Sequence, residues 1–179
     1  MARTPLPAAM LVVTAWLAFV IPGSALAEVY QTPESFVGEA LGNVAPAPQT
    51  LWLNGDLQAR IRQVLGHPYK SFRVKYWRDE AKTVWVLDEI GKDEDITIGF
   101  LVNDAAIERT AVLAFRESRG WEIKFPSFTR QFAGVRLDGE DGLDRTIDGI
   151  TGATLSVDAY RRLAHLALVL HRAVTAHAP

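Results

Sequence analysis

The spacing of apolar residues changes twice along the chain, and these changes divide most of it into helix, sheet and helix. Over 55–65 the apolar positions recur every three or four residues, behind Asn54 as a candidate N-cap and ahead of Gly66. This is typical of a short amphipathic helix. From 71 to 115 the period falls to two, in four runs rich in β-branched and aromatic residues: 71–77, 83–87, 96–102 and 107–115. Short polar stretches separate the runs, so the pattern predicts an antiparallel meander of about four strands.

The flanking segments predict helices around this sheet. Residues 156–175 have a long helical pattern whose apolar face suits one face of the sheet, and whose arginines and histidines make it too polar to span a membrane. A short helix is expected at 128–132, and another at 35–41 within a polar N-terminal strap, 28–54. The predicted fold class is therefore α+β, with one domain over 28–179.

The composition removes several function classes. The 179 residues include 19 Lys and Arg against 21 Asp and Glu, with a formal net charge of -2 and no cysteine. Without a broad basic field, no nucleic-acid partner is expected. Without cysteine, this sequence has no disulfide, zinc–thiolate site or thiol redox chemistry. His165, His171 and His177 are spaced by six and do not share a helix face, so no metal site is expected.

The first 27 residues have the pattern of an export signal. Arg3 is their only charged residue, an uncharged and mostly apolar stretch covers 4–21, and small residues at 25–27 form a cleavage site. Residues 1–27 are therefore predicted to be a signal peptide cut before Glu28, and the mature protein to be periplasmic or secreted. The alternative is a retained membrane anchor, because the apolar run approaches spanning length. The prolines around that run favour cleavage.

The candidate chemistry lies just before the last predicted helix, over 148–156. Two glycines, three hydroxyl side chains and free backbone amides meet there at a helix N-terminus. The helix dipole and the unpaired amides favour an anion such as phosphate, and glycine permits its close approach. The alternative is an ordinary cap, in which Ser156 or Thr154 accepts a hydrogen bond from a first-turn amide.

The residues Asp148, Thr151, Gly152, Ala153 and Thr154 spell Asp-x-x-Ser/Thr-Gly-Ala-Thr. This resembles the flavinylation motif of the FMN-binding domain family, which includes a subunit of sodium-pumping quinone reductases and small exported flavoproteins. Further likeness extends upstream, so the resemblance covers roughly residue 96 to the end of the last helix.

The resemblance implies an FMN joined through its phosphate to the hydroxyl of Thr154. It also implies a partner, an exported FAD-dependent FMN transferase, because the chain has no phosphoryl-transfer machinery of its own. Asp148 would serve recognition by that enzyme or hold the loop. The Thr151 hydroxyl would bind the phosphate or cap the turn. Leu155 and Ser156 complete this part of the predicted cofactor site.

A second set of site residues follows the fourth predicted strand. Glu117, Ser118, Arg119 and Gly120 occupy a loop that the resemblance places near the flavin. Trp121 either covers a face of the flavin ring or packs in the core. The larger pump subunits have a glycine-leucine-glycine version of this loop, from which the present sequence departs.

The function expected from these observations is an exported electron-transfer flavoprotein that passes electrons between redox partners in the membrane or the periplasm. No catalytic residue is assigned. Two other functions stay open: a non-redox secreted binding or structural domain whose helix cap spells the motif, and a flavin-dependent reductase with a small substrate of its own.

Overall fold

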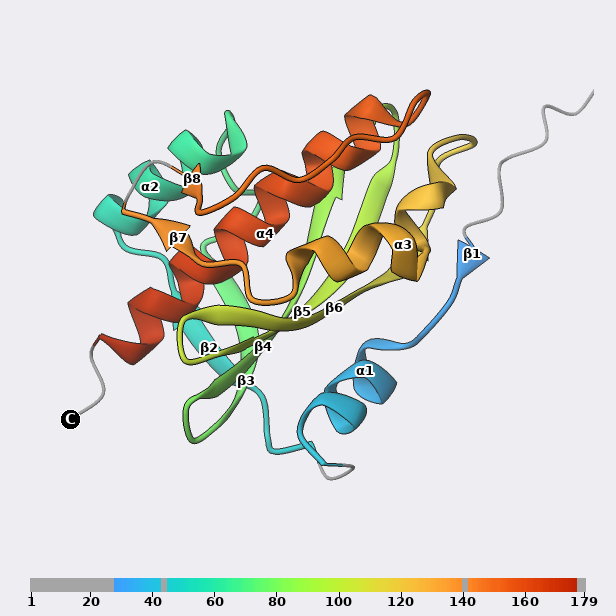
Figure 1. The fold of residues 1–179 in the computed structure, drawn as a ribbon. Coiled ribbons are helices and arrows are strands. Elements are labelled where there is room, and N and C mark those ends of the chain that lie inside the picture. Colours follow the sequence, from blue (N-terminus) through green and yellow to red (C-terminus); the bar gives the residue numbers. More distant parts are fainter. Residues whose placement is uncertain (1–27, 43–44, 140–141, 177–179) are drawn as a thin grey trace, which may run out of the picture.

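The central element is a six-stranded antiparallel sheet with helices on both faces, seen in a computed structural model that describes residues 28–42, 45–139 and 142–176 (Figure 1). The predicted signal peptide lies outside these residues. The strand order is β1-β6-β5-β4-β3-β2. The α+β class and the antiparallel meander predicted from the sequence are confirmed.

The four predicted strands form the middle of this sheet as consecutive hairpin neighbours. They are β3 (Arg73–Asp79), β4 (Lys82–Ile90), β5 (Asp95–Asn103) and β6 (Ala106–Phe115). Two registers matter for the site, because Ile90 pairs with Asp95 and Ile96 pairs with Phe115. The turn between β4 and β5 therefore lies at the same end of the sheet as the last residue of β6.

The stretch expected as a strap contributes both edge strands. It contains β1 (Glu28–Val29), α1 (Pro33–Ala40) and β2 (Gln49–Trp52), with β1 paired to β6 and β2 paired to β3. The helix begins two residues before the predicted start because the Thr32 hydroxyl accepts a hydrogen bond from the Ser35 amide at 3.2 Å. Helix α2 (Gly55–Leu65) follows β2 as predicted, with the Asn54 side chain as its N-cap and Gly66 in the left-handed region at its end.

The last helix, α4 (Thr154–Thr175), lies across one face of the sheet (Figure 1). Tyr160 is fully buried there, edge-on to Phe100 of the sheet and stacked on Phe132 at 4.6 Å between ring centroids. Its hydroxyl donates to Thr110 Oγ1 at 2.9 Å, because the Thr110 hydroxyl itself donates to the Gly99 carbonyl. None of the helices in the described part of the chain is long and apolar enough to cross a membrane.

Short elements connect β6 to α4. The 3₁₀ turn η1 (Trp121–Lys124) leads into α3 (Pro126–Thr129) and η2 (Arg130–Phe132), where the sequence predicted one short helix over 128–132. The two-residue strands β7 (Leu137–Asp138) and β8 (Gly142–Leu143) then pair with each other.

A smaller apolar cluster closes the other face of the sheet beneath α1. It comprises Phe36, Val37, Val84, Leu101 and Leu113. Gly99 lets Phe36 lie flat on β5, since a Cβ atom there would come within 2.6 Å of the aromatic ring.

Candidate functional site

The predicted motif forms the start of α4. Thr154 is the first residue of the helix, two residues before the predicted start, and Ala153 occupies the N-cap position. Ala153 has no side-chain acceptor, and no side chain among the described residues accepts from the amides of Thr154, Leu155 or Ser156. The capping alternative is therefore not what the geometry shows. The first-turn amides remain free to bind an anion.

The loop after β6 lies directly against this helix start. Gly120 has a φ of 90°, and a Cβ at that position would clash with the Ser156 hydroxyl and lie 3.1 Å from Ser156 Cβ. Only glycine satisfies both the backbone conformation and the close approach. The loop and the motif, more than thirty residues apart in sequence, are thus held in contact.

A cavity of about 500 Å³ lies between them. From the motif it is lined by Gly152, Ala153, Thr154, Leu155 and Ser156, and from the loop by Glu117, Ser118 and Arg119. Its volume falls within the range of small-molecule sites, which is roughly 300 to 1,000 Å³. Thr154 is exposed, so its hydroxyl is open to a modifying enzyme.

Lys92 also lines the cavity, and the sequence reasoning did not find it. It lies in the turn between β4 and β5, where the polar sequence predicted only a hairpin connection. Glu117 holds this turn: its Oε1 atom accepts from the backbone amides of Lys92, Asp93 and Glu94 at 2.5, 2.7 and 2.9 Å. The ion pair with Asp93 raises the pKa of Lys92, while the Arg119 charge opposes that rise. The lining therefore combines two cations and a helix N-terminus with one carboxylate, that of Glu117, whose Oε1 atom already accepts from three amides.

Four of the predicted residues, including Gly120, do not line the cavity. Asp148 and Thr151 are exposed on the approach to α4. Trp121 is 42% exposed, lies edge-on to Phe125 at 5.3 Å, and belongs to neither the cavity lining nor the buried core. Its proposed contact with a flavin ring has no support from the lining.

Two side chains missed by the sequence reasoning anchor the motif loop. The Gln131 side chain accepts from the Asp148 amide at 2.7 Å, and Arg161 donates to the Ile147 carbonyl. No sequence pattern marks these contacts, because each joins a side chain to a backbone group of a separate segment.

The donor set suits a phosphate group. The free amides of α4, the Lys92 ammonium and the Arg119 guanidinium are the groups that bind phosphate in proteins. Among the described residues, no group of three or more histidine, aspartate and glutamate side chains gathers as metal ligands. His177 lies outside those residues.

Comparison of the chain with protein-family models, with curated proteins and with solved structures gives no match. The likeness to the FMN-binding domain family therefore rests on the sequence motif alone.

Proposed function

We propose that this protein is an exported electron-transfer flavoprotein with FMN attached through its phosphate to Thr154. The observation that carries the proposal is the cavity that joins the Gly152–Ser156 motif to the Glu117–Arg119 loop, with Lys92 and Arg119 at its wall. An ordinary helix cap requires neither the cavity nor the cations. A binding site for a phosphate-bearing cofactor requires both.

The attachment is a phosphoryl transfer in which Thr154 is the acceptor. The Thr154 oxygen attacks the FMN-side phosphorus of FAD, the bond from that phosphorus to the bridging oxygen breaks, and AMP leaves. The hydroxyl proton passes to a base on the transferase, and no oxidation state changes. An exposed threonine at the start of a helix suits this reaction, because the partner enzyme must reach the hydroxyl from solvent.

The chain then holds the phosphodiester. Its negative charge lies at the positive end of the α4 dipole, where the amides of Leu155 and Ser156 are free to donate. Lys92 and Arg119 add the counter-charge. When bound, FMN supplies the exchange of one or two electrons. Covalent attachment prevents loss of the cofactor outside the cell, which agrees with the predicted signal peptide and a periplasmic or secreted location.

The test is co-expression with an FAD-dependent FMN transferase, followed by a denaturing gel viewed for flavin fluorescence. Wild-type protein should fluoresce and Thr154→Ala should not, whereas Thr151→Ala should fluoresce like wild type. Thr154→Ser should retain part of the signal, because a hydroxyl nucleophile remains. Protein made without the transferase is the colourless control.

Labelling of Thr154→Ala together with loss of labelling in Thr151→Ala would assign the wrong threonine. An unlabelled wild type made beside the active transferase would favour the non-redox alternative. Turnover of a small substrate by the labelled protein alone would favour the reductase alternative. The mass of the exported protein tests the start at Glu28 in the same preparation.

A further inference from the structure

Unpaired buried nitrogen atoms concentrate between α2 and α4, away from Thr154. Five buried side-chain nitrogen or oxygen atoms lack a hydrogen-bond partner among the described residues, and four of them are Arg60 Nε, Arg60 Nη2, Arg162 Nε and His165 Nε2. A buried polar atom without a partner destabilises a fold by roughly 1–3 kcal/mol. Unpaired buried nitrogen atoms are rare in folded proteins, so four in one region call for a physical explanation.

A cavity of about 360 Å³ is lined by two of the three residues that carry these atoms, Arg162 and His165. Its polar lining consists of Arg145, Thr146, Arg161, Arg162 and His165, and its apolar lining of Val64, Leu143 and Ile147. No carboxylate lines it. Arg60 lies one turn before Val64 on α2, and its charge acts on His165.

The surrounding ion pairs leave positive charge in excess. Asp144 faces Arg145 at 3.4 Å, and Asp158 faces Arg161 at 2.9 Å. The remaining carboxylate, Glu89, is 4% exposed and is shared by two cations.

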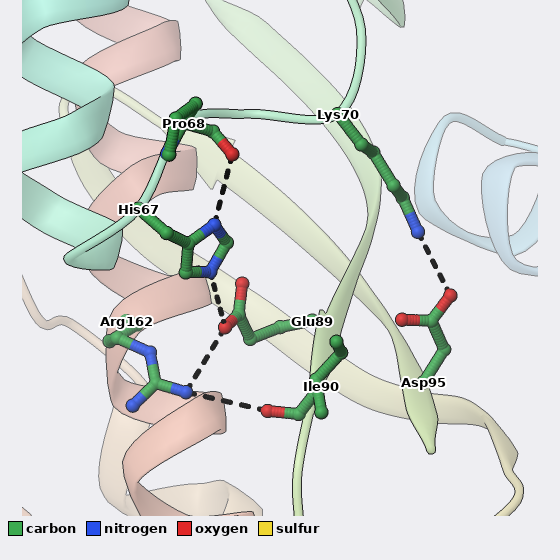
Figure 2. A network of polar contacts seen from close by, with 7 residues as sticks. All are labelled: His67, Pro68, Lys70, Glu89, Ile90, Asp95 and Arg162. Atoms are coloured by element: carbon green, nitrogen blue, oxygen red, sulfur yellow. Dashed lines mark hydrogen bonds and ion pairs between the residues drawn. The ribbon is translucent and has the colours of Figure 1, made fainter. Parts of the chain in front are cut away.

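Figure 2 shows these two partners of Glu89: Arg162 Nη2 at 3.1 Å and His67 Nε2 at 2.9 Å. His67 Nδ1 also lies 2.9 Å from the Pro68 carbonyl, which can only accept, so the protonated ring suits both neighbours, and the hydrogen bond to Glu89 raises the pKa of His67. Arg60 has no ion pair among the described residues, so the four arginines of this region, Arg60, Arg145, Arg161 and Arg162, outnumber its three carboxylates.

We propose that this cavity binds a phosphate group, with Arg145, Arg162 and His165 as its donors. A tetrahedral dianion offers several acceptor oxygens, which suits guanidinium and imidazole donors arriving from a helix and a loop. The cavity is larger than one phosphate, so the group is either free or carried by a small organic molecule. The site is separate from Thr154, because Arg161 lies seven residues further along α4, about 10 Å along the helix axis.

The pKa of His165 provides a second way to detect phosphate in this cavity. In the unbound protein, burial and the charges of Arg60 and Arg172 lower the pKa of His165. Arg145, Arg161 and Arg162 line the same cavity as His165. A bound dianion opposes all of these effects, so the pKa of His165 should rise when phosphate binds.

The experiment measures binding of inorganic phosphate to the mature chain by calorimetry, at constant ionic strength set with chloride. Saturable binding is expected, weakened about tenfold in Arg145→Gln and in His165→Gln, since a charge-assisted hydrogen bond is worth about 1.5–3 kcal/mol. Arg62→Gln removes a cation of α2 that does not line the cavity, and should bind like wild type. Phenyl phosphate in place of inorganic phosphate tells the sources apart: tighter binding indicates an organic phosphate, and equal binding a free one.

Three results would overturn the proposal. The first is absence of saturable binding, which would mean that water fills the cavity. The second is binding that is lost in Lys92→Gln or Arg119→Gln but kept in Arg145→Gln, which would move the phosphate to the start of α4. NMR of the histidine rings is the second readout, and a His165 signal that titrates identically with and without bound phosphate would also refute the assignment. None of these results depends on flavin at Thr154, so the two proposals fail separately.

Discussion

Glu117 is predicted to hold the turn that carries Lys92, and Glu117→Ala tests this directly. One carboxylate oxygen accepts from three consecutive amides, those of Lys92, Asp93 and Glu94. A hydrogen bond to a charged group contributes about 1.5–3 kcal/mol. The three amides share one oxygen and lie in exposed residues that regain water when the side chain is removed. We therefore expect a total loss in the free energy of unfolding of about 1.5–3 kcal/mol, not three times that value.

The assay is urea unfolding, combined with hydrogen exchange of the three amides. Glu117→Gln keeps an acceptor oxygen without the charge and should lose about half as much. Ser118→Ala, at an exposed neighbour in the same loop, is the matched control and should change little. Wild-type stability in Glu117→Ala, with unchanged exchange at Lys92, would show that the carboxylate does not hold the turn.

Two further predictions concern the rest of the fold. The protonated His67 ring donates from both nitrogens, and the hydrogen bond to Glu89 is the chief cause that raises its pKa. The contribution of His67 to the free energy of unfolding is therefore complete below the unfolded pKa of about 6.5. It is lost as the pH rises through the higher pKa of the folded protein. In urea unfolding between pH 5.5 and 8.5, the free energy of unfolding of wild type should fall by under about 1 kcal/mol relative to that of His67→Gln, a small effect because the ring is half-exposed. The same pH dependence of stability in both proteins would contradict this prediction. Gly99→Ala should lower the free energy of unfolding by about 1–3 kcal/mol, because its methyl group meets the Phe36 ring at 2.6 Å. The additional change Phe36→Leu should recover part of that loss in the same urea unfolding experiments. An unchanged stability in Gly99→Ala would show that Phe36 is not in tight contact with β5.

The sequence predicted the middle of the sheet because its strands are long enough to show a period of two. The sequence did not predict the two edge strands, because β1 has only two residues and β2 only four. A strand of two or four residues is too short for an alternation of apolar and polar residues that differs from chance. These two strands form because they pair with β6 and β3, and their own residues do not specify the extended conformation.

The candidate site divides in the same way. Thr154 and its neighbours carry a motif, and a helix start is a local feature that a sequence displays. Lys92 carries no motif, and it reaches the cavity because a carboxylate 25 residues away binds its backbone amide. Backbone amides are common to nearly every residue, so such a contact leaves no trace in the sequence.

The location of the cavity follows from the register of the meander. Ile90 pairs with Asp95, so the turn between them projects from one end of the sheet, and Ile96 pairs with Phe115, so β6 ends beside that turn. The chain leaving β6 must therefore pass the turn, which brings Glu117 to its amides. Gly120 then admits the start of α4 at contact distance. A shift of β6 by one residue would turn its side chains to the opposite faces of the sheet and move Glu117 off the turn, so the hairpin pairing that builds the core also builds the cavity.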